Sequence, residues 1–164
     1  MWSNPLGFRG TSVRRAGADG RLARGIGRMA EVTNAVRPSL TTAERNSVEE
    51  VGGPGSFSTP LETVGKSGIR HKFTFGTEGK GGANLACDVV VGSAPVDETR
   101  VLSLFIKVYD VGVKQAMLCV VPSLSSEAMK LAIQYKILVV EAKDEVGIAP
   151  ALVGALKKTV RGAD

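Results

Sequence analysis

The sequence has few of the residues on which most catalytic and redox chemistry depends. Its 164 residues include one histidine, two cysteines and 5% aromatic residues. His71 is the one candidate general base, and no serine or cysteine in a strained elbow marks a nucleophilic partner for it. Cys87 and Cys119 lie in separate apolar runs, which predicts buried free thiols, and a disulfide between neighbouring strands remains the alternative.

Long hydrophobic runs are missing as well. No apolar stretch approaches the roughly 18 residues that a membrane-spanning helix needs, and residues 1–10 lack the apolar core of a secretory signal. We therefore expect a cytoplasmic protein without a membrane partner. The chain length fits one domain with a tail, and 43% hydrophobic residues are enough to build a buried core.

Most of the chain has no net charge. The protein carries +5 overall, but residues 1–28 contain six arginines and a single acid. Residues 29–164 therefore hold 15 of the 21 basic residues and 15 of the 16 acidic residues. Because the charge of this part sums to zero, it gives no general argument for binding DNA.

The basic segment, residues 1–28, is rich in Gly, Arg and Ser and has no apolar period, which predicts a disordered extension. Three interpretations are open: a nucleic-acid-binding tail, an organellar targeting peptide, or a start codon assigned too far upstream. We favour the third, because the composition changes at Met29, which would then replace Met1 as the first residue.

Residues 29–57 form a polar segment with one short helical candidate. The helix is expected over residues 41–51, with Thr41 or Thr42 as its N-cap and the glycines from Gly52 onward ending it.

Residues 58–164 have the pattern of an α/β domain. The first half predicts antiparallel strands, and the second half alternates strands with helices, which implies right-handed crossovers and parallel pairing. The predicted fold class is α/β, a mixed sheet with an antiparallel N-terminal meander followed by parallel βαβ units. The expected strands are residues 59–64, 69–75, 83–91, 115–121 and 137–141, with a glycine-rich turn over residues 76–82.

Three helices are expected in this domain. Pro95 opens the first and Gly112 closes it, Ser125 caps the second, and the third covers residues 150–160. The first helix has apolar residues at the spacing i, i+3, i+4 and i+7, which predicts that they form its buried face: Leu102, Phe105, Ile106 and Tyr109.

Gly65-Lys66-Ser67 is similar to the end of a phosphate-binding P-loop. That motif requires a glycine five residues before Gly65, where this sequence has Pro60, and it must lead into a helix. The segment here leads into a predicted strand, so we exclude a P-loop.

The stretch Ser67-Gly68-Ile69-Arg70-His71-Lys72-Phe73 is followed by an acid-bearing strand and then by helix, strand, helix and strand. This order resembles the restriction-endonuclease-like (PD-(D/E)xK) superfamily, and within it small archaeal proteins of poorly defined function. The resemblance covers residues 59–142. Its local matches are Val108-Tyr109-Asp110-Val111-Gly112, residues 116–122, Leu124-Ser125, residues 128–132 and residues 137–141.

The resemblance implies a site in which acids on two adjacent strands hold Mg²⁺ and a lysine orients the attacking water. In this chain Thr74 stands at the first acid position. Asp88 keeps the second acid, but Val90 stands where the family has its lysine. Glu62 is a candidate third acid, and Lys107 on the following helix is a candidate replacement lysine.

The missing ligands predict a non-catalytic module of nuclease-like fold, without a cofactor, that binds nucleic acid or a protein partner in a regulatory or scaffold role. The alternative is a Mg²⁺-dependent DNA endonuclease with a migrated site made of Glu62, Asp88 and Lys107 or Lys72. The resemblance also implies a homodimer. Two basic clusters are candidates for phosphate contacts: Lys66, Arg70, His71 and Lys72, and, near the C-terminus, Lys157, Lys158 and Arg161.

Overall fold

A computed structural model describes residues 34–53 and 55–161 of the chain. They belong to one compact unit that starts at Thr33, so the polar segment before residue 58 is part of the same unit as the α/β domain. The basic extension predicted over residues 1–28, and the choice between Met1 and Met29 as first residue, lie outside the described residues. In the described part no helix is long and apolar enough to cross a membrane.

The main sheet is mixed, with five strands in the described part. Three strands run parallel in the order β5, β6, β7, and two short strands, β1 and β4, pair antiparallel with different halves of β5. This arrangement confirms the predicted mixed sheet with parallel βαβ units, but the strand predicted over residues 59–64 does not join it and belongs to a separate two-stranded sheet. The bounds are β1 (Ala35–Val36), β4 (Phe75–Gly79), β5 (Gly82–Val91), β6 (Gln115–Val121) and β7 (Leu138–Glu141).

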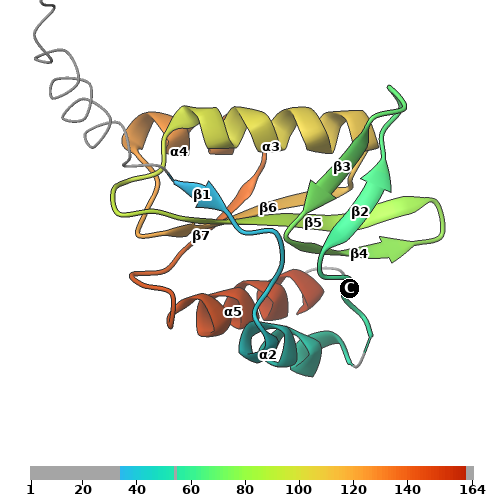
Figure 1. Ribbon diagram of the computed structural model, residues 1–164, viewed down its shortest axis with the longest axis horizontal. Coiled ribbons are helices and arrows are strands. Elements are labelled where there is room, and N and C mark those ends of the chain that lie inside the picture. Colours follow the sequence, from blue (N-terminus) through green and yellow to red (C-terminus); the bar gives the residue numbers. More distant parts are fainter. Residues whose placement is uncertain (1–33, 54, 162–164) are drawn as a thin grey trace, which may run out of the picture. The chain divides into compact units, whose positions relative to one another are not determined.

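Helices cover both faces of the sheet (Figure 1). One face carries α3 (Glu98–Val111) and α4 (Ser126–Gln134), and the other carries α2 (Thr42–Gly52) and α5 (Ile148–Arg161). A separate antiparallel hairpin of β2 (Leu61–Val64) and β3 (Arg70–Phe73) lies against α3.

The predicted caps of α2 and α4 and the predicted end of α3 are present, but Pro95 does not open α3, which begins at Glu98 with Asp97 as its N-cap. Thr41 and Glu44 form a capping box at the start of α2, and the Ser125 hydroxyl accepts the Ala128 N–H at the start of α4. Gly112 ends α3 in the left-handed conformation at φ 76°, which a glycine adopts without strain.

The strand predicted over residues 69–75 is divided in two. It breaks at Thr74, where the chain leaves the β2–β3 hairpin and enters β4 of the main sheet. The glycine-rich turn predicted over residues 76–82 is mostly strand, because only Lys80 and Gly81 separate β4 from β5. Gly76 serves close packing: a Cβ there would lie 2.3 Å from the Leu85 carbonyl oxygen on β5.

The prediction of which face of α3 is buried is wrong. Tyr109, Ile106 and Leu102 are 75%, 62% and 39% exposed, whereas Val101 and Leu104 are fully buried. Apolar residues occupy more than half of the circumference of this helix, so the same periodicity fits two overlapping faces.

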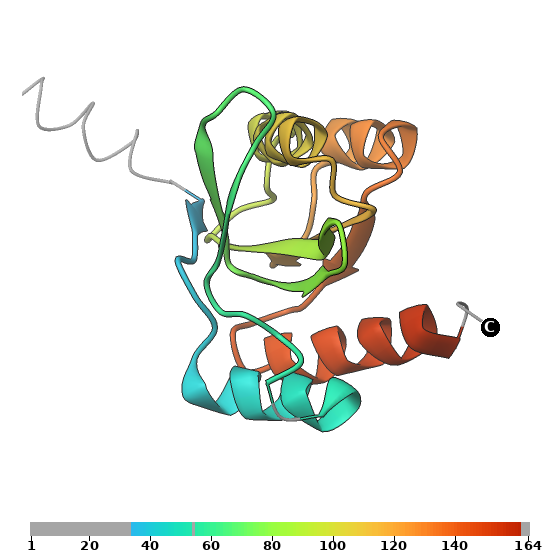
Figure 2. The same cartoon turned by 90° about the vertical axis from the view of Figure 1, so that its right-hand side faces the viewer.

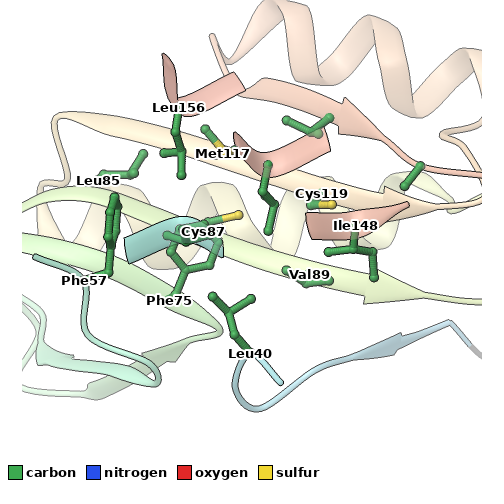
Figure 3. Packing of buried hydrophobic residues seen from close by; sticks show 14 of the residues in the cluster. Leu40, Phe57, Phe75, Leu85, Cys87, Val89, Met117, Cys119, Ile148 and Leu156 are labelled. Carbon is green, nitrogen blue, oxygen red and sulfur yellow. The ribbon is translucent and has the colours of Figure 1, made fainter. Parts of the chain in front are cut away.

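The core on the α2 and α5 side of the sheet contains both cysteines (Figure 3). Cys87 and Cys119 are free thiols without solvent exposure, as the sequence predicts. Burial raises the pKa of Cys119 to about 12 and the pKa of Cys87 well above its usual value. Both thiols are therefore structural side chains with little thiolate character.

Candidate functional site

The acid that the resemblance singles out, Asp88, lies in the middle of β5 with its side chain only 5% exposed. Lys107 of α3 reaches it, with Nζ 2.5 Å from Oδ2, and also donates to the Lys72 carbonyl oxygen at 3.0 Å. The ammonium lies 4.7 Å from the centre of the Phe73 ring. The other carboxylate oxygen, Oδ1, accepts the Thr74 N–H at 3.3 Å. Both oxygens of Asp88 therefore have partners within the protein.

Thr74, which stands where the family has its first acid, connects two strands. Its hydroxyl donates to the Arg37 carbonyl oxygen at 2.6 Å and accepts the Val89 N–H at 3.0 Å. At this point along β5 its antiparallel neighbour changes from β4 to β1. Where the neighbour changes, the Arg37 carbonyl oxygen and the Val89 N–H have no strand partner, and the Thr74 hydroxyl forms a hydrogen bond with each.

Glu62 faces away from Asp88. It pairs with Lys72 across the β2–β3 hairpin, and the neighbouring pair, Leu61 and Phe73, is buried, so Glu62 lies on the outer face. Its carboxylate is 3.6 Å from Lys72 Nζ and 3.7 Å from an Arg70 nitrogen.

These residues do not fit the Mg²⁺ that the resemblance implies. Magnesium is held through carboxylate oxygens that are free to coordinate it. Asp88 is already bound by an ammonium group, and residues 34–53 and 55–161 contain no group of three His, Cys, Asp or Glu side chains that could hold a metal ion.

A second polar cluster, centred on Asp110, joins the hairpin to α3. Asp110 Oδ2 accepts the Ser67 hydroxyl and contacts His71 Nε2, each at 2.6 Å, and Oδ1 accepts the Ser67 N–H at 2.9 Å. The serine hydroxyl and the imidazole both bind the acid and not each other, so the cluster is not a catalytic triad. Hydrogen bonds from Ser67 and His71 lower the pKa of Asp110 to about 2.

We expect Asp110→Asn to reduce the acid sensitivity of the fold. Because the folded-state pKa of about 2 lies below the usual aspartate pKa of 3.8, the ionised acid stabilises the protein above pH 3.8 and loses this effect as the pH falls towards 2. Urea unfolding from pH 5 to pH 2 should therefore show a steeper loss for the wild type than for Asp110→Asn. Glu127→Gln removes an exposed charge as a control, and equal pH dependence in wild type and Asp110→Asn would contradict the assignment.

Exposed lysines collect at one end of the domain. The parallel strands β6 and β7 begin at this end, so α3 and α4, which directly precede them, end there. A groove lined by Gln115, Leu138 and Lys158 shows that α5 ends there too. This end lies on the right in Figure 1 and faces the viewer in Figure 2. We call its lysines the lysine face: Lys66, Lys80, Lys114, Lys136, Lys157 and Lys158.

Two contacts connect the turns of this end. The Lys66 N–H donates to the Asp110 carbonyl oxygen at 2.9 Å, which places the hairpin turn beside the end of α3. The Lys114 N–H approaches the Ala83 carbonyl oxygen at 3.4 Å, close to the β4–β5 turn that carries Lys80. Within the described part of the chain, no lysine of the lysine face forms an ion pair.

Acids gather at the opposite end, where β7 finishes and the helices begin. Asp97 caps α3, and Glu98 and Glu127 lie in the first turns of α3 and α4. Glu141 ends β7, and Asp144 and Glu145 follow it. Arg37, Arg100 and Lys143 lie at this end too, so the neutral net charge of this part of the chain conceals a partial separation of charge along the strand direction.

The structure separates the two predicted basic clusters into three groups. Lys66, Lys157 and Lys158 belong to the lysine face. Arg70 and Lys72 lie with Glu62 on the outer face of the hairpin, whereas His71 contacts Asp110 on the inner face. Arg161 is the last residue of α5, and its side chain lies outside the described part.

Sequence reasoning missed Asp110 and three lysines of the lysine face, Lys80, Lys114 and Lys136. Asp110 follows Lys107 by three residues, a spacing that puts both side chains on one flank of α3. Lys80, Lys114 and Lys136 each lie one or two residues before a strand, and this shared position is the signal that predicts a common end.

Comparisons with known proteins give a relative for the fold and none for the activity. No protein-family model matches the chain, and no curated protein matches it. One solved structure that resembles it is an archaeal protein of unknown function, AF1548, with a TM-score of 0.51 and 18% sequence identity. The match covers 67% of this chain and 61% of AF1548, so this chain corresponds to about three fifths of that protein. At this identity the likeness is one of α/β fold alone.

Proposed function

We propose that this protein is a non-catalytic module of restriction-endonuclease-like fold that binds nucleic acid through the lysine face. The observation that carries the proposal is the set of exposed lysines at one end of the domain that form no ion pair with any other described residue. They come from five separate segments: the β2–β3 turn, the β4–β5 turn, the two loops before β6 and β7, and the end of α5.

The positive charge of the lysine face exceeds the negative partial charge of the helix C-termini that lie there. Four helices, α2, α3, α4 and α5, direct their C-termini at this end, and each contributes about half a negative charge. These partial charges sum to about 2 and offset only a minority of the lysines. Of the acids nearby, Asp110 is held by Ser67 and His71, and Glu49 pairs with Arg45. Two exposed acids are left, Glu50 in the last turn of α2 and Glu78 beside the β4–β5 turn. The remaining positive charge on exposed ammonium groups would attract the phosphate backbone of a nucleic acid.

The lack of catalysis rests on the state of Asp88. Its two oxygens are occupied by Lys107 and the Thr74 N–H, and Glu62 lies on the other face of the hairpin. The proximity of Asp88 and Lys107 is also the feature that favours the alternative, a divalent-metal-dependent endonuclease with a migrated lysine. That alternative requires a second carboxylate to move next to Asp88.

The test is a binding and cleavage assay on the full chain and on a chain that begins at Met29, which lacks the six N-terminal arginines. Both should bind labelled nucleic acid with an affinity that falls steeply between about 50 and 200 mM salt. Neither should cut plasmid DNA in the presence of Mg²⁺ or Mn²⁺.

Two results would overturn the proposal. Cleavage that disappears in Asp88→Ala would establish the endonuclease. Absence of salt-dependent binding by the chain from Met29, if that chain is folded by circular dichroism, would leave a protein partner, including a second copy of this chain, as the remaining role.

A further inference from the structure

An exposed aromatic side chain lies at the border of the lysine face. Tyr109, in the last turn of α3, is 75% exposed. The next residue along the helix, Asp110, accepts the Lys66 N–H, and the Lys66 side chain reaches Gly112 just beyond the helix. Tyr109 is therefore less than one helical turn from the hairpin turn that carries a lysine of the face.

Tyr109 is the exposed end of a row of three aromatic rings. Its ring centre is 6.0 Å from that of Phe105, which in turn stacks on Tyr135 at 4.1 Å with 17° between the ring planes. Phe105 and Tyr135 are partly buried between α3 and α4. Lys136, another lysine of the face, directly follows Tyr135. The row thus runs between two segments of the lysine face, and its outermost ring is backed by a packed neighbour.

We infer that the lysine face takes unpaired nucleic acid, with Tyr109 as a platform on which a base stacks; this rests on the function proposed above. Lysines alone attract any phosphate backbone, single-stranded or duplex. A ring that is exposed beside them adds affinity only for a base whose own face is free, because the bases of a duplex already stack on each other. The combination of cations and an exposed ring distinguishes a single-strand site from a general phosphate site.

The ligand is defined by chemistry common to DNA and RNA, a phosphodiester strand with unstacked bases. The full chain should be titrated, by fluorescence anisotropy, with labelled 12-mers of deoxythymidine and of uridine and with a 12-base-pair duplex. Both single strands should bind more tightly than the duplex. The order of the deoxythymidine and uridine strands shows whether the site prefers DNA or RNA.

Substitution of the ring separates stacking from charge. Tyr109→Ala should weaken binding of the single strands by about fivefold or more, since loss of one base–aromatic stack has an effect of that order. The same change should leave duplex affinity within about twofold. Tyr109→Phe keeps the ring and should bind as the wild type does. Leu102→Ala, on the same flank of α3 but two turns away from the lysine face, is the matched control and should have no effect.

The inference and the function it rests on fail in different ways. Equal affinity for single strand and duplex, or single-strand affinity unchanged in Tyr109→Ala, would overturn the stacking role while leaving salt-dependent binding intact. Absence of binding to all three oligonucleotides would overturn both.

Discussion

Replacing Lys107 with methionine is expected to lower the free energy of unfolding by about 3–5 kcal/mol, the usual effect of breaking a buried ion pair. The change leaves the Asp88 carboxylate, whose side chain is 5% exposed, without its ammonium partner at 2.5 Å. It also removes the donor to the Lys72 carbonyl oxygen and the cation above the Phe73 ring. Urea unfolding followed by circular dichroism measures the loss.

A second substitution identifies the cause of that loss. Asp88→Asn combined with Lys107→Met removes both charges but keeps an oxygen that can accept the Thr74 N–H, so the double variant should recover most of the lost stability. Lys130→Met breaks an exposed pair with Glu127, and its effect should stay within about 0.5 kcal/mol. If Lys107→Met is as stable as Lys130→Met, the buried pair does not hold α3 to the sheet.

The second half of the fold could be predicted because its signals are local. A continuous apolar run from Ala116 to Val121 marks β6. Ser125 marks a helix start through its side chain, and Gly112 marks a helix end through its backbone conformation. In each case a few neighbouring residues contain the whole signal.

The first half required information that a single sequence does not contain. Thr74 ends one strand because its hydroxyl bonds to Arg37, which is 37 residues away along the chain. The orientation of Glu62 depends on the register of the β2–β3 hairpin, and a shift of one residue would turn it towards α3. The candidate metal site could therefore be listed by residue type but not assembled.

The net charge of residues 29–164 does not show how charge is distributed, because the distribution also depends on contacts between distant parts of the chain. A sum over residues 29–164 is zero, yet several of the turns and loops that carry lysines lie at one end of the domain. The order of elements determines which loops share an end, and the lysines of those loops then act together.

Neutralising three lysines of the lysine face should remove much of the salt dependence of binding. Each lysine that contacts a phosphate contributes about 0.7 to the slope of log affinity against log salt for a single strand. Changing Lys114, Lys136 and Lys157 to glutamine should therefore reduce the slope by about two and weaken binding at every salt concentration. All three side chains are exposed and form no ion pair within the described residues, so the fold should keep its stability.

The decisive measurement compares this triple variant with a charge-matched one in the full chain, so that the N-terminal arginines are present in both. The matched variant changes Arg45, Lys130 and Lys143, exposed residues outside the lysine face, to glutamine. Anisotropy titrations of a labelled 12-mer over a salt series should show the slope falling by about two for the first variant and unchanged for the second. Equal slopes for the two variants would mean that nucleic acid responds only to total charge and that the lysine face is not a binding site.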